Sequence, residues 1–175
     1  VSEAIKPHYE AIATQARAVK VNYIDETAWY QHGVLAWLWV MVNTTVALFT
    51  VQTSRSRAAF EALIERWAGI LVSDGYGVYQ HWMHQRQTCV AHLIRRARGL
   101  SERKDPDVAW FGSRVLAELQ RLVHWAHAPP TAGEVQTWYM RMVHLLNQYG
   151  GRQDEAGTFA RTLEREMASL WTFVV

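Results

Sequence analysis

Ile70-Leu-Val-Ser-Asp-Gly-Tyr76 is a short apolar run that ends abruptly in a carboxylate. Gly75 follows Asp74 at once, a pattern typical of a buried strand that stops at the edge of a sheet. Val21-Asn-Tyr-Ile-Asp-Glu-Thr27 repeats the pattern and runs into Asp25. Open α/β sheets bind their ligands at the carboxyl ends of the strands. The two stretches therefore predict two acids that face one site.

The composition sets the broad class of protein. The 175 residues suffice for one domain, and half of them are hydrophobic, with nine Trp, so a substantial core is available. The net charge of +2 is too small to indicate nucleic-acid binding by itself. The single Cys89 cannot form an internal disulfide, which favours a reducing, cytoplasmic compartment. Since the chain opens on Val1, shows no signal-peptide pattern and stops among apolar residues, we expect it to be cut from something longer.

Val34 to Val51 is the most apolar part of the chain and carries no charge. Its length alone would allow a transmembrane helix. Asn43-Thr-Thr45 interrupts its middle, however, and β-branched and aromatic residues dominate on both sides. This pattern favours a hairpin with strands over about 36–42 and 45–51, which are apolar on both faces and therefore belong inside a sheet.

Hydrophobic periodicity predicts the other elements. Before Cys89 we expect a helix over 2–19, a strand over 21–25, a turn at 31–33, a helix over 60–67, a strand ending at Asp74, a short helix over 76–82 and a weak edge strand over 86–88. From Cys89 onward, four apolar stripes separated by Pro and Gly predict four helices. This order suits a mixed α/β sheet with a crossover, and it is by analogy the order of a ribonuclease-H-like fold.

Asp25 and Asp74 are the first candidates for chemistry. Two carboxylates can hold Mg²⁺ or Mn²⁺, because hard cations prefer oxygen ligands. Two such ions, about 3.5–4 Å apart, can activate a nucleophile and stabilise a leaving oxygen in phosphoryl transfer. The alternative is that Asp-Gly forms a turn and that Asp-Glu-Thr caps a helix, and spacing alone favours this alternative.

Cys89 and His92 form the second candidate. At positions i and i+3 of a helix, a thiol and an imidazole share a face and could bind zinc. A structural zinc site needs four ligands, and no second pair with suitable spacing is present. We therefore expect both residues at one helix start, pointing inward near the sheet edge, without zinc.

A basic cluster between residues 86 and 104 is the third candidate. Its six cations stand against Glu102 alone, and they are Arg86, Arg95, Arg96, Arg98, Arg103 and Lys104. Arg95 and Arg96 lie off the apolar stripe of their helix, so they face either water or a polyanion. Contact with a phosphate backbone and a simple solvated helix face fit this pattern equally well.

Together these motifs resemble the DDE transposases of the insertion sequence 66 family. In the same order as in that family, the chain has Asp25-Glu-Thr27, Trp39 on a strand, Arg55 after the hairpin, Val72-Ser-Asp-Gly-Tyr76, and Cys89-x-x-His92-x-x-Arg95-Arg96. The similarity is close from Val21 to Leu100 and looser over the later helices. Each motif alone is weak, and the ordered set is specific.

The resemblance implies a ribonuclease-H-like catalytic domain that cuts and joins DNA at the ends of a mobile element. Asp25 and Asp74 would be the first two acids that hold Mg²⁺ or Mn²⁺, and Arg86, Arg95 and Arg96 would contact DNA. Cys89 and His92 would match a Cys-x-x-His signature of the family. The implied organisation is a leading helix over 1–20, part of the catalytic core over 21–105 and a helical insertion over 106–175. The implied partners are element ends and target DNA, with a homo-oligomer in the full-length protein and no membrane.

One feature of the family has no counterpart in these residues. The family carries its third acid on an Asn-Asn and Glu-Arg segment after the last helix, and this chain stops at Val175 before such a segment. Glu26 cannot replace it, because it points to the opposite face of its strand from Asp25. We therefore expect this chain to be an inactive part of a transposase. The alternatives are a non-catalytic remnant that binds DNA or transposase subunits, and a metal-dependent nuclease of the same fold.

Overall fold

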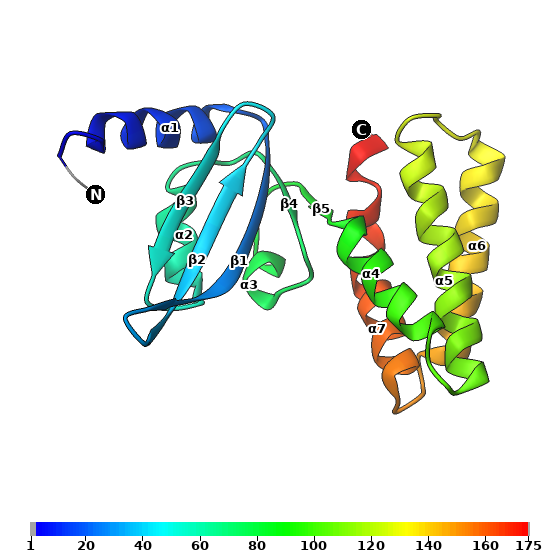
Figure 1. Cartoon of the computed structure of the whole chain (residues 1–175). Helices are drawn as coiled ribbons and strands as arrows, with labels where there is room; N and C mark the ends of the chain where they lie inside the picture. Colours follow the sequence, from blue (N-terminus) through cyan, green and yellow to red (C-terminus); the bar gives the residue numbers. More distant parts are fainter. Residues whose placement is uncertain (1–2, 175) are drawn as a thin grey trace. The chain divides into compact units, whose positions relative to one another are not determined.

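The computed structural model describes residues 3–174. The chain divides into two compact units, Val1–Gln87 and Thr88–Val175. The first unit is built on a sheet and the second is helical (Figure 1). Each unit has its own hydrophobic core.

The first unit is a mixed α/β structure. Its elements are α1 (Lys6–Ala18), β1 (Val21–Gln31), β2 (Val34–Val42), β3 (Ala47–Gln52), α2 (Arg57–Ile64), β4 (Ile70–Ser73), α3 (Gly77–Gln80) and β5 (Arg86–Thr88), the last of which ends at the first residue of the second unit. The strand order is β3-β2-β1-β4-β5. Strand β1 pairs antiparallel with β2 and parallel with β4. This five-stranded mixed sheet is compatible with the ribonuclease-H-like fold expected from the sequence.

Two tight turns explain the antiparallel part of the sheet. His32 and Gly33 have φ values of 50° and 79°, the left-handed conformation that a two-residue hairpin needs. Asn43 shapes the second turn, because its side-chain oxygen accepts hydrogen bonds from the backbone nitrogens of Thr45 and Val46 at 2.9 and 3.1 Å. The predicted turn and hairpin are confirmed, and β2 lies between β1 and β3.

The transmembrane alternative finds no support in the fold. Val34 to Val51 contributes strands β2 and β3 instead of a helix. Over residues 3–174, none of the helices combines the length and the apolar character needed to span a bilayer.

Strand β1 is longer than the sequence indicates. We predict a strand that stops at Asp25, and the structure extends it to Gln31. The reason is the pairing with β2, which runs without interruption from Tyr23 opposite Val42 to Gln31 opposite Val34. Cross-strand pairing over this whole length outweighs the polar residues that suggest a strand end.

The core of the first unit lies on one face of the sheet. Its largest fully buried side chains are Trp39, Met41, Leu48, Leu63, Leu71 and Tyr79. Helix α2 ends at Ile64 instead of continuing to Trp67, because Glu65 adopts a φ of 50°. Trp67 then stacks on Trp82 with ring centroids 5.4 Å apart.

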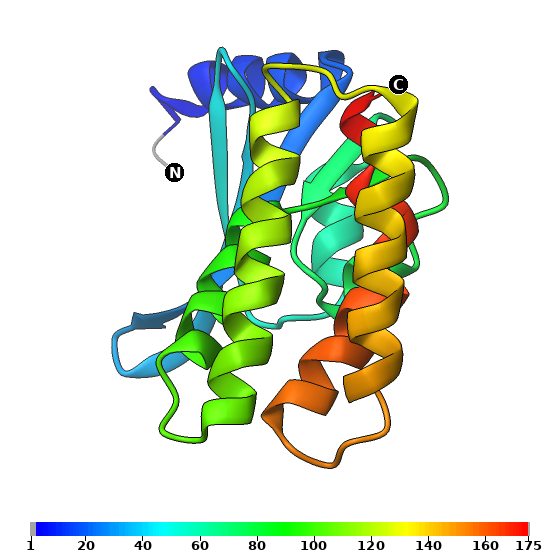
Figure 2. The ribbon, with the colours of Figure 1, turned by 90° about the vertical axis from the view of Figure 1, so that its right-hand side faces the viewer.

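The second unit consists of helices that lie side by side (Figure 2). Aromatic and aliphatic side chains form its core. Its elements are α4 (Val90–Ser101), α5 (Pro106–Trp125), α6 (Ala132–Tyr149), α7 (Glu155–Glu166) and the 3₁₀ turns η1 (Met167–Leu170) and η2 (Thr172–Val174). Asp105, Thr131 and Asp154 cap three of the helices with side-chain hydrogen bonds to their first turns. The four predicted helices are confirmed, and the last one tightens into a 3₁₀ turn after Glu166.

Candidate functional site

Asp25 lies in the middle of β1. Exposure alternates along this strand, so that Ile24 and Glu26 are buried while Asp25 is exposed. The expectation that Asp25 ends its strand is therefore wrong, and the expectation that Glu26 points to the opposite face is confirmed. The backbone N–H of Glu26 donates to Oδ1 of Asp25 at 3.0 Å. The pairing of β1 with β2, which sets Asp25 opposite Val40, thus fixes the backbone of this acid.

Asp74 directly follows β4, as the sequence predicts. Its side chain is half-buried, and its Oδ1 accepts the backbone N–H of Tyr76 at 2.9 Å. This bond from the residue two positions later is the Asx-type turn that an Asp-Gly pair favours. A local turn, instead of a sheet ladder, therefore orients this acid.

The parallel pairing of β1 and β4 ends two residues before each of the two acids. Strands β1 and β4 pair Val21 with Ile70 and Tyr23 with Val72. Asp25 follows Tyr23 by two residues, and Asp74 follows Val72 by two residues, so a continued register would set the two acids on the face that Tyr23 and Val72 share. Neighbouring strands lie about 4.8 Å apart, so two carboxylates in this position can share one ion.

The chemistry of this donor pair suits a hard divalent cation. Both side chains offer carboxylate oxygens, and one of them is exposed to solvent. Over residues 3–174, the structure contains no group of three or more His, Cys, Asp or Glu side chains arranged to hold a metal. The pair therefore provides two ligands, and waters or further groups would have to complete the coordination.

A buried ionic network lies behind the acid pair. The Glu26 side chain is fully buried, and Nε and Nη2 of Arg55 both reach its Oε1 at 2.6 Å. The Tyr79 hydroxyl donates to the second oxygen of Glu26. Burial raises the pKa of the Glu26 carboxyl, while the hydrogen bonds from Tyr79 and Arg55 and the charge of Arg55 act against this rise.

Electrostatics tie this network to the two acids. Burial raises the pKa of Tyr79 strongly, and the hydrogen bond to Glu26 and the negative charges of Asp74 and Asp25 raise it further. The hydroxyl therefore stays protonated and acts as a donor. The negative charge of Asp74 also acts on Glu26.

Aromatic rings enclose the guanidinium of Arg55. Its central carbon lies 3.9 Å from the ring centre of Tyr76 and 5.1 Å from that of Trp37. The Tyr76 hydroxyl donates to the backbone oxygen of Arg55 at 2.7 Å. The sequence motif includes Arg55 without a role, and neither spacing nor periodicity indicates that Tyr79 is its neighbour around Glu26.

The three arginines predicted to bind DNA have different surroundings. Arg86 is half-buried in the first unit, and its Nη1 donates to the backbone oxygen of Asp74 at 3.4 Å. Arg96 lies 4.7 Å over the ring of Phe159 and donates to Thr162 at 3.2 Å, and burial lowers its pKa. Arg95 is exposed.

Cys89 and His92 begin helix α4. Cys89 is the N-cap residue, and the backbone N–H of His92 donates to its carbonyl oxygen at 3.2 Å. Both side chains are half-buried. Their location at one helix start is as predicted, whereas the absence of zinc and a place near the sheet edge stay predictions.

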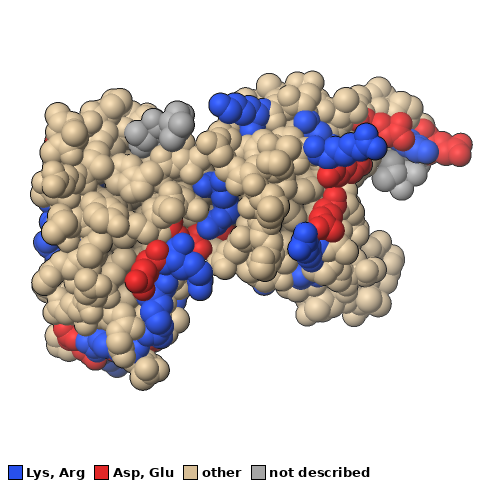
Figure 3. Space-filling model, turned by 180° about the vertical axis from the view of Figure 1, so that it is seen from behind, with Lys and Arg blue, Asp and Glu red and all other residues tan. Residues whose placement is uncertain are grey.

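Surface charge does not gather into a large patch of one sign in the view of Figure 3. Lysine and arginine side chains alternate there with aspartate and glutamate. In the first unit, for example, Lys6 pairs with Glu10 and Arg57 pairs with Glu61. DNA binding by this face would therefore depend on individual cations.

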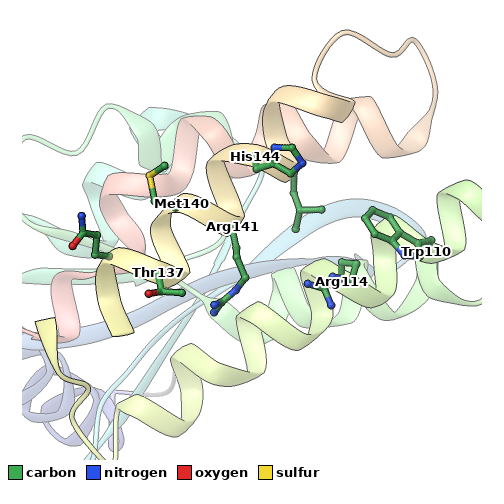
Figure 4. Close-up of a pocket in the computed structure, with 8 residues that line it drawn as sticks. Trp110, Arg114, Thr137, Met140, Arg141 and His144 are labelled. Atoms are coloured by element: carbon green, nitrogen blue, oxygen red, sulfur yellow. The ribbon is translucent and has the colours of Figure 1, made fainter. Parts of the chain in front are cut away.

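A groove of about 700 Å³ lies between α5 and α6 of the helical unit (Figure 4). Trp110, Arg114, Met140, Arg141 and His144 line it. The guanidinium of Arg141 is already bound to the buried carboxylate of Glu118 at 2.7 and 2.9 Å. This groove contains none of the residues that the sequence singles out.

Comparison with known proteins identifies the family. The family described as "Transposase IS66 family" matches residues 1–170. Neither the curated proteins nor the solved structures yield a match to the chain. The family match covers nearly the whole chain and agrees with the ordered motifs around Asp25 and Asp74, so the chain belongs to the IS66 family of transposases.

Proposed function

We propose that Asp25 and Asp74 hold Mg²⁺ or Mn²⁺ in the catalytic centre of a DDE transposase. The observation that carries this proposal is the parallel register of β1 and β4, which supports a position of the two acids side by side two residues beyond the last pair. Family membership supports the transposase role. The mixed sheet supports a ribonuclease-H-like catalytic core, and the helices after it suit the family's helical insertion.

The proposed reaction is phosphoryl transfer at the ends of a mobile element. Divalent ions, when bound, activate the attacking oxygen and stabilise the leaving oxygen, first for strand cutting by water and then for attack of the freed 3′-hydroxyl on target DNA. Asp25 and Asp74 supply oxygen ligands to this centre. Arg86, next to Asp74, and the exposed Arg95 and Arg96 are the side chains that we expect to contact DNA phosphates.

We further propose that a third acid completes the centre in the active protein. Two carboxylates can hold one ion, whereas the two-metal mechanism needs a further ligand for the second ion. We therefore expect these 175 residues alone to bind Mn²⁺ weakly and to leave DNA uncut. Self-association of the full-length protein and a cytoplasmic location stay predictions.

Metal titration tests the proposed site. We expect Asp25→Asn and Asp74→Asn each to weaken Mn²⁺ binding in calorimetry or electron paramagnetic resonance. Glu61→Gln is the matched control, because Glu61 is a carboxylate of the same unit that pairs with Arg57 at the surface of α2. Equal Mn²⁺ affinity in all four proteins would refute the assignment of the acids.

A DNA assay tests the expected activity. The chain is incubated with Mn²⁺ and a duplex that carries the element's ends. Metal-dependent nicking that Asp74→Ala abolishes would show that a third acid is already present among these residues. Cutting without joining would favour a nuclease, and DNA binding that is indifferent to both acids would favour a non-catalytic remnant.

A further inference from the structure

We propose that Arg55 and Glu26 are positioning residues that hold the carboxylates of Asp25 and Asp74 in the geometry that binds metal. This inference rests on the proposed function of the two acids. It concerns the buried side of the sheet, because the Glu26 side chain faces away from Asp25 and cannot be a ligand beside it.

Hydrogen bonds fix the side chains of Arg55 and Glu26 relative to each other. Both Nε and Nη2 of Arg55 contact one oxygen of Glu26 at 2.6 Å, and the Tyr79 hydroxyl holds the other oxygen. Every carboxylate oxygen of Glu26 therefore has a donor. Charge-assisted bonds of this kind are short and directional, so the Glu26 side chain has one position.

Glu26 is connected to Asp25, and Arg55 is connected to Asp74 through Tyr76. Glu26 follows Asp25 and donates its backbone N–H to the Asp25 carboxylate at 3.0 Å. Tyr76 donates its backbone N–H to the Asp74 carboxylate at 2.9 Å. The ring of Tyr76 lies under the Arg55 guanidinium at 3.9 Å, and its hydroxyl donates to the Arg55 carbonyl at 2.7 Å. Arg55 thus lies between the two residues whose amides orient the two acids.

Arg55 also acts through its charge. Asp25, Asp74 and Glu26 bring three negative charges close together, and the Glu26 charge is buried. A guanidinium 2.6 Å from Glu26 offsets part of this repulsion. Stability alone does not require the pair, since well-packed apolar residues of similar volume often serve as well as a buried ion pair. Fixing the two acids is a task that an apolar pair could not perform.

The experiment compares two arginine-to-lysine variants. Arg55→Lys keeps a positive charge but loses the planar fork that reaches Glu26 and stacks on Tyr76. Arg17→Lys is the matched control, because Arg17 is also a partly buried guanidinium of the first unit, bonded to the Leu63 carbonyl and to Glu65 away from the acids. We measure the Mn²⁺ dissociation constant, the urea unfolding curve and the exchange rates of the Glu26 and Tyr76 amides.

We expect Arg55→Lys to weaken Mn²⁺ binding about 10- to 100-fold, the effect typical of groups that orient metal ligands. The Glu26 and Tyr76 amides should also exchange faster, even without metal. Arg17→Lys should change stability by a comparable amount without either effect. Glu26→Gln, which removes the charge and keeps the shape, should reproduce the loss of affinity in part.

Three results would overturn the inference. Mn²⁺ affinity equal in Arg55→Lys and wild type would show that the network only stabilises the fold, and equal losses in both lysine variants would show a general effect of destabilisation. If Asp25→Asn leaves Mn²⁺ binding unchanged, the proposed metal site itself fails. Amide exchange in the metal-free protein then decides whether Arg55 positions the two acids, and unchanged exchange would refute that role.

Discussion

Gly69→Ala should displace the start of β4 and with it the proposed site. A Cβ atom on Gly69 would lie 2.3 Å from the backbone oxygen of Lys20 and 2.7 Å from the ring of Trp67. The same Lys20 oxygen accepts the backbone N–H of Ile70 at 2.7 Å, where β4 begins to run beside β1. Because the nearest obstacle is backbone, no side-chain rotation can relieve the contact.

The size of the effect follows from these distances. For an ordinary contact, the new Cβ atom and the Lys20 oxygen would have to lie about 1 Å farther apart. This separation would stretch the hydrogen bond from the Ile70 N–H to the Lys20 oxygen. Overpacking of this kind costs about 1–3 kcal/mol, and a weakened backbone hydrogen bond adds about 1 kcal/mol. We therefore expect Gly69→Ala to lower the free energy of unfolding by about 2–4 kcal/mol, a large part of the stability of an ordinary domain.

Amide exchange is the suitable assay, because Trp side chains occur in both units and fluorescence would report on both. Protection should fall in β1 and β4 and persist in the helical unit, and Mn²⁺ affinity should fall with it. Gly77→Ala is the matched control in the same unit, since a Cβ there would meet no heavy atom within 4 Å apart from its chain neighbours and its own helix backbone. Equal protection in the two alanine variants would refute the reasoning about the close approach at Gly69.

Two further predictions concern the helical unit. The hydrogen bond from Tyr149 and then that from Arg152 lower the pKa of Asp107, so its contribution to stability is present above pH 3.8 and is lost as the pH falls toward the lower folded value. Between pH 6 and pH 2.5, the melting temperature of Asp107→Asn should therefore fall less than that of the wild type. An equal fall in both proteins would contradict this. Glu118→Ala leaves Arg141 without its carboxylate and should cost about 3 kcal/mol in urea unfolding, the low end for a broken buried pair because the Arg141 side chain is 30% exposed. A loss below about 1 kcal/mol would show that solvent already screens the pair.

Elements with local signals could be predicted from the sequence. The hairpin between β2 and β3 depends on Asn43, whose side chain bonds to backbone only two and three residues away. The break between α5 and α6 follows from Pro129 and Pro130, and the next helix opens with a capping box of Thr131 and Glu134. Each of these features is specified within a few residues, so pattern and composition suffice to find it.

Features that depend on distant partners could not be predicted. Arg96 lies off the apolar stripe of its own helix and is exposed as expected, whereas its contact with the ring of Phe159 depends on α7, which is distant in the sequence. Glu26 reads as an ordinary strand residue, and only folding brings Arg55 and Tyr79 to its two oxygens. A buried charge can be recognised in a sequence only when its counter-charge is also known to be near.

The two acids of the site are held by different means, and this explains why one strand end was predicted correctly and the other was not. Asp25 is opposite Val40 in an antiparallel ladder that continues to Gln31, so its backbone is fixed by long-range pairing that a single strand does not reveal. Asp74 stands where β4 has already ended, and its own turn to Tyr76 fixes it, which is a local signal. The site therefore combines an acid set by the sheet with an acid set by a turn. The distance between the two acids depends on the contacts that connect the turn to the sheet. The stacking of Tyr76 on Arg55 and the hydrogen bond from Arg55 to Glu26 form such a connection.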